Sequence, residues 1–335
     1  MAKPTLLITG GAGFIGSHLV DVALGQGYAV RVVDNLVGGH ERNLAHHGDN
    51  QDLTFEKLDI RDLDAEHSVF KGVKSIAHYA GIGDIVPSIE RPVEYMDTNV
   101  QGTVRVLDGA RAAGVEKVVY AASSSCYGLA DTPTREDHAI QPQYPYALSK
   151  YQGEQAAFHW HQVYNLPVNS IRIFNAYGTR VRTTGAYGAV FGVFFRQKLA
   201  GEPFTVVGDG TQTRDFLYAS DVARAFLAAT ETPLTGQIWN LGAGAPQSVN
   251  RLVELIGGPV TYVPKRPGEP DVTHADITKI TRDLGWAPTV PFEEGVAKMM
   301  AEIDVWKDAP LWTPDTIEDA TKTWFKYLGN DKGAA

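Results

Sequence analysis

The sequence predicts an α/β fold in which a doubly wound parallel sheet carries helices on both faces and is joined to a smaller α+β domain. Three observations lead to this prediction. Short β-branched apolar runs alternate with helical patterns through the first half of the chain, and a glycine-rich turn follows the first of these runs. Glycine and proline turns become frequent after about residue 175. Strand–helix alternation is typical of parallel sheets with right-handed connections.

The expected strands are short buried runs flanked by polar residues or glycine. They are Thr5–Thr9, Ala29–Asp34, Leu53–Leu58, Ser75–Tyr79, Lys117–Ala122 and Val168–Phe174, and the helices between them include Ile15–Leu24, Thr98–Ala113 and Ala147–Val163. The segment Phe216–Thr230 indicates one more strand and helix that return to the sheet. We therefore expect one domain over residues 1–174 with about 216–240, and a second over 175–215 and 241–330.

Length and composition exclude several classes of protein. At roughly 150 residues per domain, 335 residues indicate two domains. A content of 44% hydrophobic and 21% charged residues excludes a disordered chain, and 34 glycines without a strict period exclude a collagen. The net charge of −9 disfavours a nucleic-acid partner, and it means that an anionic ligand must be held by a few local donors.

The chain shows no sign of a membrane span or an oxidising compartment. It lacks the run of about eighteen apolar residues that a bilayer span requires. The start, with Lys3 before Leu6-Leu7-Ile8, indicates a strand entering a glycine turn rather than a signal peptide. The single cysteine, Cys126, excludes an intramolecular disulfide and suits a cytoplasmic location.

A cofactor site is indicated where the first strand meets the first helix. Gly10, Gly13 and Gly16 allow a tight turn, close approach of the backbone to a pyrophosphate, and close packing of helix on strand. The helix start behind them, with Phe14 and Ile15, offers free N–H groups to phosphates. Asp34 and Asn35 end the second strand, and a carboxylate there accepts bonds from a ribose 2′-hydroxyl and repels a 2′-phosphate. The sequence thus predicts a Rossmann-like fold that binds NAD rather than NADP.

These motifs resemble those of the extended short-chain dehydrogenase/reductase family, in its branch of NAD-dependent nucleotide-sugar epimerases and dehydratases. The resemblance covers nearly the whole chain. It implies that Asp59 and Ile60 contact adenine and that Asn99, also predicted among the cofactor-binding residues, lies in the helix that braces the central sheet. Further cofactor-lining positions that it implies are Tyr79, Ala80, Gly81, Ala121, Ile173 and Phe174.

A candidate catalytic pair opens the expected helix Ala147–Val163. Tyr146 and Lys150 are four residues apart, so they share one helix face. A free tyrosine is a poor base at neutral pH because its pKa is about 10. We expect Lys150 and a positive nicotinamide to lower the pKa of Tyr146. The family resemblance also assigns the hydroxyl that bonds the reacting sugar oxygen to Ser123, with Ser125 as a candidate second donor.

The residues after Ser123 bear on the reaction type. In the family, dehydratases carry an Asp-Glu pair after the catalytic hydroxyl residue, and decarboxylases carry a Glu two residues before the Tyr of a Tyr-Gly pair. This chain has Ser124 and Ser125 at those places, which favours a 4-epimerase. Cys126 lies one residue before Tyr127, a position unlike that of the cysteine in epimerases acting at C3 and C5, and we expect it to pack as a small hydrophobic residue.

We expect no metal site. His46 and His47 lie in a polar loop, and His159 and His161 point to different faces of one helix.

The resemblance also implies residues on the substrate side. Asn175, Arg214 and Arg266 are expected to bind a diphosphate, and Glu269 a ribose. Two guanidiniums suit a diphosphate because their forked donors bind oxygens bidentately. Ser88 is expected near the sugar, and Thr273 at a position that gates the sugar pocket, where a small residue leaves room for an N-acetyl or carboxylate group.

The sequence as a whole predicts NAD-dependent 4-epimerisation of a UDP-sugar through a 4-keto intermediate. The alternatives are a nucleotide-sugar 4,6-dehydratase, a UDP-glucuronate decarboxylase, or an NAD(H)-sensing protein without catalysis. The resemblance implies a homodimer packed through the helices Thr98–Ala113 and Ala147–Val163 as four helices. It does not identify the sugar.

Overall fold

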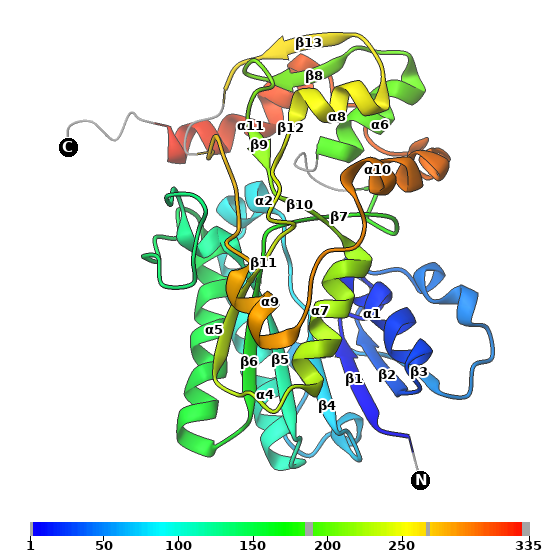
Figure 1. The fold of residues 1–335 in the computed structure, drawn as a ribbon, viewed down its shortest axis with the longest axis vertical. Helices are drawn as coiled ribbons and strands as arrows, with labels where there is room; N and C mark the ends of the chain where they lie inside the picture. The colour runs from blue at the N-terminus through cyan, green and yellow to red at the C-terminus, as the bar shows by residue number, and fades with distance from the viewer. Residues whose placement is uncertain (1–2, 185–189, 266–268, 330–335) are drawn as a thin grey trace.

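The computed structural model describes residues 3–184, 190–265 and 269–329, which form a lower part built on a large sheet and an upper part of small sheets and helices (Figure 1). In the described residues the central sheet has seven strands in the order β11-β6-β5-β4-β1-β2-β3, all paired in parallel. The strands are β1 (Thr5–Thr9), β2 (Ala29–Asp34), β3 (Leu53–Lys57), β4 (Ser75–His78), β5 (Lys117–Ser123), β6 (Val168–Ile173) and β11 (Gln237–Leu241). This is a Rossmann-like fold, and its strand order reverses between β1 and β4, where such sheets bind ligands.

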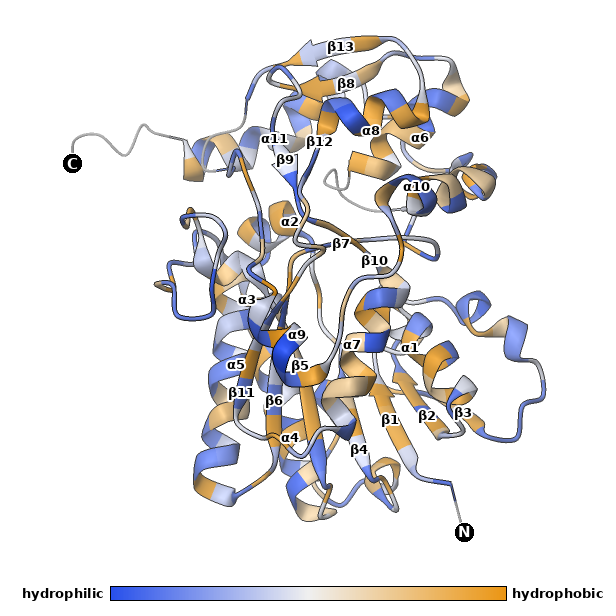
Figure 2. Cartoon of the chain, viewed as in Figure 1, coloured by the Kyte–Doolittle hydropathy of each residue, from blue (hydrophilic) through white to orange (hydrophobic). Residues whose placement is uncertain are grey.

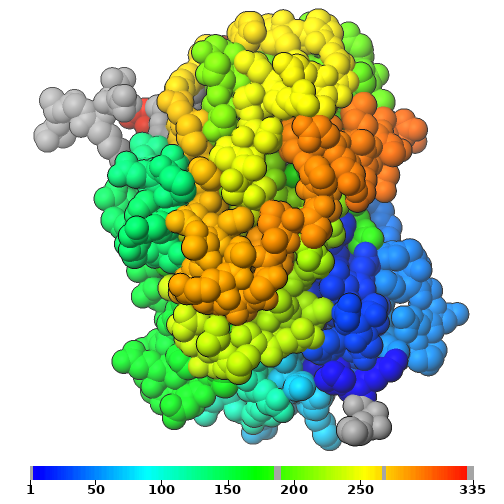
Figure 3. Space-filling view, in the orientation of Figure 1, coloured from blue at the N-terminus to red at the C-terminus, as the bar shows by residue number. Residues whose placement is uncertain are grey.

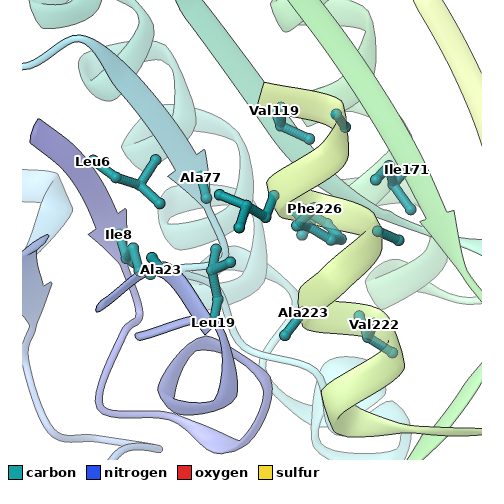
Figure 4. Close-up of a cluster of buried hydrophobic side chains, with 14 of the residues drawn as sticks. Leu6, Ile8, Leu19, Ala23, Ala77, Val119, Ile171, Val222, Ala223 and Phe226 are labelled. Atoms are coloured by element: carbon teal, nitrogen blue, oxygen red, sulfur yellow. The ribbon is translucent and has the colours of Figure 1, made fainter. Parts of the chain in front are cut away.

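Helices cover both faces of this sheet, as predicted. Leu6 and Ile8 of β1 pack with α1 (Phe14–Gly25) and α7 (Ala219–Glu231), whereas Leu7 belongs to the core under α4 (Thr103–Ala112) and α5 (Pro145–Tyr164). This alternation follows from the two-residue period of a strand. Figure 4 shows the first core, where Phe226 of α7 lies among side chains of β1, β4, β5 and β6. The strands of the lower part are mostly hydrophobic in colour, between helices with hydrophilic surfaces (Figure 2).

The strand boundaries expected in the first half of the chain differ from the observed ones by at most one residue at either end. The helix expected over Thr98–Ala113 is less regular than predicted. The range holds most of a π-helical turn over Asp97–Gly102 and then α4, and the helix α3 (Pro92–Met96) comes directly before it. The π-helical turn contains Asn99, whose side chain bonds the backbone of a loop beside the sheet, and such turns are frequent at functional sites.

The strand expected at the start of Phe216–Thr230 does not join the central sheet. It is β10 (Phe216–Tyr218), which pairs with β7 (Asn175–Tyr177), while β11 takes the sheet edge next to β6. The physical reason is side-chain packing, because Phe216 and Tyr218 are buried in the core of the upper part. The helix α7 does return to the sheet, as predicted, and packs against α1.

The upper part has its own core of aromatic and aliphatic side chains. It contains two further small sheets, β8 (Phe204–Val207) with β13 (Val260–Val263) and β9 (Thr213–Arg214) with β12 (Gln247–Ser248). Its helices are α2 (Ile85–Glu90) at its lower boundary, α6 (Val190–Ala200), α8 (Val249–Ile256), α10 (Phe292–Ala301) and α11 (Pro314–Leu328).

The helix α9 (Thr278–Leu284) falls within the range expected for the second domain, yet it packs on β11 and α7 of the lower part. The indole of Trp239 in β11 donates to Asp283 at 3.0 Å, and Ile280 is fully buried there. In the space-filling view the orange segment with α9 and α10 lies across the front of both parts (Figure 3). The domain limits expected from the sequence stay a prediction.

Candidate active site

A cavity of about 790 Å³ lies at the carboxyl ends of β1, β4, β5 and β6 and reaches up to residues of the upper part. Most residues predicted for the cofactor, the reaction and the substrate line it. They are Gly10, Gly13, Phe14, Ile15, Gly16, Asp34, Asn35, Ile60, Tyr79, Ala80, Gly81, Ala121, Ser123, Ser125, Tyr146, Lys150, Ile173, Phe174, Asn175, Arg214, Glu269 and Thr273. Residues far apart in the chain therefore meet at one site.

The turn between β1 and α1 is formed by backbone packing that only glycine allows. Gly10 has a φ of +72°, and its N–H donates to the carbonyl of Val33 at 2.7 Å. A Cβ on Gly16 would lie 2.3 Å from the Gly10 carbonyl oxygen. The start of α1 has no side-chain cap at Gly13, so its first N–H groups face the cavity uncapped. A close glycine cradle at an uncapped helix start fits the pyrophosphate of a dinucleotide.

Asp34 closes the far end of this cradle. Its carboxylate accepts from the N–H groups of Ala12 at 3.0 Å and Leu36 at 2.8 Å. Burial raises the pKa of Asp34, while these backbone bonds oppose the rise. A Cβ on Gly39 would lie 2.8 Å from both carboxylate oxygens, so the chain passes close over this side chain. A fixed acceptor at the end of β2 fits a ribose hydroxyl, in agreement with the prediction of NAD.

Of the two residues predicted to contact adenine, one lines the cavity and the other lies behind the lining residues. Ile60 lines the cavity, whereas Asp59 does not. Asp59 accepts from Asn35 at 2.9 Å and forms an ion pair with Arg61 at 2.7 Å, which is the main reason that its pKa is lowered. Arg61 itself lines the cavity. No sequence motif marked this residue, although it directly follows Asp59 and Ile60.

Asn99 acts as a brace, as the family resemblance implied, and it does not line the cavity. Its amide accepts from the Ile82 N–H at 2.9 Å and donates to the Ile82 carbonyl at 3.0 Å and the Ser149 hydroxyl at 2.9 Å. A Cβ on Gly81 would lie 2.8 Å from Asn99 Oδ1. The side chain thus ties the loop after β4 to α5, which carries Tyr146 and Lys150.

The candidate catalytic hydroxyls meet at the end of β5. The phenol of Tyr146, at the start of α5, lies close enough to the Ser123 side chain for Ser123 to lower its pKa. The Ser123 hydroxyl donates to that of Ser125 at 3.1 Å and accepts from the Ser125 N–H at 3.2 Å. The structure therefore brings together the three hydroxyls that were predicted to carry the proton chemistry.

The electrostatics of Tyr146 differ from the prediction. Burial raises the pKa of Tyr146, and the interaction with the Ser123 side chain opposes this rise. The Lys150 ammonium lies 4.5 Å from the ring centre of Tyr120 and is not among the groups that shift Tyr146. Burial lowers the pKa of Lys150 to about 8, opposed by the negative charge of Glu154 one turn further along α5. The spacing of Tyr146 and Lys150 predicts that they share a helix face but does not predict how deeply they are buried. Burial is the largest influence on the pKa values of both groups here.

A buried ion pair holds α5 against β6. Arg172 and Glu154 are 3% and 1% exposed, and Arg172 Nη2 lies 2.5 Å from Glu154 Oε1. Arg172 also donates to the Tyr127 hydroxyl at 2.7 Å, and Tyr127 donates to Asn240 at 2.8 Å. This network joins α5, β6, β11 and the turn after Ser123. Sequence analysis missed it because its members come from four distant segments.

Cys126 lies in the turn after β5 and is buried. Burial raises the pKa of its thiol to about 12, so the reactive thiolate is scarce at neutral pH. The prediction that it packs as a small hydrophobic residue is confirmed.

The predicted substrate residues form pairs across the upper end of the cavity. Arg214 Nη2 lies 2.9 Å from Glu269 Oε1, and the Thr273 hydroxyl donates to Asn175 Oδ1 at 2.6 Å. Thr273 also accepts from the Asp215 N–H at 3.1 Å, so its hydroxyl is held between two segments. An arginine at this end supplies the local positive charge that a chain of net charge −9 needs for an anionic ligand.

Two predicted substrate residues lie elsewhere. Ser88 is fully buried in α2, where its hydroxyl donates to the Ile85 carbonyl at 2.6 Å, and it does not line the cavity. Arg266 lies outside the described residues. The structure in turn adds Tyr144, Asp84 and Trp324 to the cavity wall. No sequence motif marked these three residues.

Within the described part of the chain, one cluster has ligand atoms close enough for a metal ion. The Nε2 atoms of His46 and His47 each lie 2.8 Å from Asp21 Oδ1. The other carboxylate oxygen is paired with Arg180 at 2.7 Å. The cluster lies apart from the cavity lining, and the absence of a metal stays a prediction.

No helix in the described ranges is both long and apolar enough to cross a membrane.

The glycine cradle, the acid at the end of β2, and a Tyr–Lys pair beside a serine hydroxyl define a dinucleotide-dependent enzyme of the short-chain dehydrogenase/reductase type. A model of the NAD dependent epimerase/dehydratase family matches residues 6–242, and the chain belongs to this family.

Relatives of known description support this assignment. A putative UDP-glucose 4-epimerase from Methanocaldococcus jannaschii is 36% identical over 304 residues, covering 88% of this chain and 97% of the relative. The solved UDP-N-acetylglucosamine 4-epimerase of Methanobrevibacter ruminantium M1, in complex with UDP-N-acetylmuramic acid, has a TM-score of 0.84 at 30% identity and covers 90% of this chain and 100% of its own. The UDP-glucuronic acid 4-epimerase of Bacillus cereus, solved with UDP-glucuronic acid and NAD, has a TM-score of 0.84 at 29% identity and covers 90% and 99%.

Proposed function

We propose that this protein epimerises C4 of a UDP-sugar with the help of bound NAD. The observation that carries the proposal is the meeting of Tyr146 and Ser123 in one cavity with the glycine cradle of β1 and α1. Bound NAD would supply the acceptor for the C4 hydride and the donor for its return to the other face of the sugar. The cradle, Asp34 and the pocket beside Lys150 are the places that would hold it.

The protein groups supply the proton chemistry and the orientation. The Tyr146 phenolic oxygen takes the proton from the C4 hydroxyl and gives it back after the 4-keto sugar has turned over. Ser123 bonds the same sugar oxygen and steadies the phenol. When protonated, Lys150 adds positive charge on the helix face that it shares with Tyr146, and positive charge nearby favours the deprotonated phenol.

The bonding of the acidic side chains along the cavity favours epimerisation over dehydration, because each of these carboxylates already has a protein partner. Among the described lining residues these are Asp34, Asp84, Glu94 and Glu269. Asp34 is bonded by backbone N–H groups, and the other three are paired with Arg182, Arg91 and Arg214, respectively. The turn after Ser123 carries serines and a cysteine, with no carboxylate for removal of water.

We also propose a homodimer through α4 and α5. Leu148, Val163 and Tyr164 of α5 are exposed at 36%, 50% and 48%, and burial in a partner helix pair would remove them from water. The mass in solution from light scattering tests this proposal. The cytoplasmic location expected from the lone cysteine stays a prediction.

The reaction is tested by product mass. The purified protein is incubated with UDP-glucose, UDP-N-acetylglucosamine and UDP-glucuronate, and the products are analysed by mass spectrometry and NMR. We expect a product of unchanged mass with inverted C4 from at least one sugar. Loss of water would identify a dehydratase, loss of carbon dioxide a decarboxylase, and unchanged substrate with bound NAD a sensor.

A further inference from the structure

The C-terminal helix α11 lies against the active-site cavity although it is far from every motif in the sequence. It begins with a capping box at Thr313 and packs against α2 (Figure 1). Its buried residues Ile317, Thr321 and Trp324 follow helical spacing on one face. The Thr323 hydroxyl donates to Glu90 of α2 at 3.2 Å. α11 also lies beyond residues 6–242, the part of the chain that matches the family model.

Trp324 reaches the reacting end of the cavity through a short series of contacts. Its side chain is 5% exposed and lines the cavity wall. Its ring centre lies 5.9 Å from that of Tyr144, whose ring lies parallel to that of Tyr146 at 6.5 Å. The Ser125 side chain lies close enough to Tyr144 to lower the pKa of its phenol, and the Ser125 hydroxyl accepts from that of Ser123. The indole is therefore one side chain away from the hydroxyls that handle the sugar oxygen.

The chemistry of this wall suits the sugar rather than the diphosphate. Aromatic rings are large and rigid, and they pack against apolar faces such as the C–H faces of a pyranose. The arginine at the diphosphate end, Arg214, comes from β9. An indole held by a helix gives a wall of fixed shape, and a wall of fixed shape excludes substituents that are too large.

We propose that α11 completes the sugar subsite and that Trp324 is a specificity-determining residue that limits the size of the sugar accepted. This inference rests on the proposed function, because it assumes that the ligand at Tyr146 is a nucleotide sugar. Trp324 bounds the space in which the sugar turns over, so a smaller side chain there admits a bulkier sugar.

The test compares Trp324→Ala and Trp324→Phe with the matched control Phe325→Ala. Phe325 is the next residue of α11, is 42% exposed and does not line the cavity. For each variant, kcat/KM is measured with UDP-glucose and with UDP-N-acetylglucosamine. We expect Trp324→Ala to raise the ratio of the second to the first by about tenfold or more, Trp324→Phe to raise it by a smaller factor, and Phe325→Ala to leave it unchanged.

An unchanged ratio in both Trp324 variants, or an equal shift in Phe325→Ala, overturns the inference. If Trp324→Ala fails to fold by circular dichroism, Trp324→Phe alone decides, because it keeps an aromatic ring in the core.

Calorimetric binding of UDP and of the two UDP-sugars separates this inference from the proposed function. If the native protein turns over none of UDP-glucose, UDP-N-acetylglucosamine and UDP-glucuronate, the epimerase proposal fails. In that case, a change in the affinity of the Trp324 variants for the UDP-sugars but not for UDP still supports Trp324 as a wall of the sugar subsite. Equal affinities of the native protein and the Trp324 variants for the UDP-sugars overturn that role.

Discussion

The two ends of the cavity are built in different ways. At the cofactor end, the cradle comes from neighbouring residues of β1 and α1, and its contacts are mostly between backbone atoms, such as Gly10 to Val33. At the substrate end, the wall comes from segments far apart in the chain and its contacts join side chains, as in Arg214 with Glu269 and Trp324 with Tyr144. Local backbone constraints leave a pattern in the sequence, whereas contacts between distant side chains do not: Arg214 and Glu269 were each expected at the substrate, but their ion pair was not.

This difference has a consequence for substitutions. A change at the cofactor end alters the path of the backbone, so it should disturb folding and NAD binding together. A change at the substrate end removes a side chain from a wall, so it should alter affinity or selectivity in a folded protein. The following variants test this contrast.

The largest effect is expected where the two ends meet. Tyr146→Phe removes the phenol that is proposed to take the C4 proton, and we expect turnover to fall at least about 10²-fold, the lower range for loss of a general acid–base group. Bound NAD, measured by absorbance after release, should be unchanged. Retained turnover would show that another residue carries the proton.

At the substrate end, Arg214→Ala should weaken UDP binding about 10- to 100-fold, because a charged hydrogen bond contributes about 1.5–3 kcal/mol. The matched control is Arg251→Ala, since Arg251 is exposed and paired with Glu254 and Glu293 away from the cavity. Calorimetric titration with UDP gives both dissociation constants. Equal affinity in the two variants would exclude Arg214 as a phosphate ligand, and an altered melting temperature in Arg214→Ala alone would contradict the contrast between the ends.

At the cofactor end, Gly16→Ala should lower the free energy of unfolding by about 1–3 kcal/mol and lower the NAD content, because its Cβ would meet the Gly10 carbonyl at 2.3 Å. Gly25→Ala in the same helix is the control. A Cβ there meets nothing within 4 Å, and the change should stabilise by about 0.5–1 kcal/mol. Urea unfolding measures both, and a Gly16→Ala protein as stable as Gly25→Ala would refute the cradle geometry.

The smallest effect concerns pH. Burial first and Arg180 second lower the pKa of His18 to about 4, and burial first and Lys150 second lower that of His78 to about 3. The unfolded chain, with histidine pKa values near 6.5, then binds more protons than the folded one below pH 6.5. Stability is therefore fully present above pH 6.5 and falls on acidification, by up to about 1.4 kcal/mol per pH unit for each group.

Both histidines belong to the cofactor end, on α1 and β4. His18→Asn should reduce the slope of the free energy of unfolding against pH between pH 6.5 and 5.5, measured by urea unfolding. This expectation holds whether or not the substitution changes the free energy of unfolding at pH 8. A slope equal to that of the native protein would show that His18 is protonated in the folded state.

Sequence patterns predicted most of the fold and the cofactor end. The strands around Leu7 and Val119 were placed because a buried parallel strand is a short apolar run, and Gly16 and Asp34 because their roles depend on residues next to them. The predicted pairing of Phe216–Tyr218 was wrong, because Phe216 and Tyr218 pack in the core of the upper part while β11 pairs with β6. The raised pKa of Tyr146 and the role of α11 escaped because burial is a property of the assembled chain.

The ion pair between Glu154 and Arg172 has a consequence for mutational data. Tyr146, Lys150 and Glu154 lie at intervals of four residues along α5, so the buried pair sets the rotation of the helix that presents the phenol. A scan that scores only turnover would place Glu154 among the residues that do chemistry, although its carboxylate is committed to the protein interior. A Glu154 variant that misaligns Tyr146 and a variant that removes the Tyr146 phenol would both lower turnover in such a scan. Only the pH profile of turnover would tell them apart.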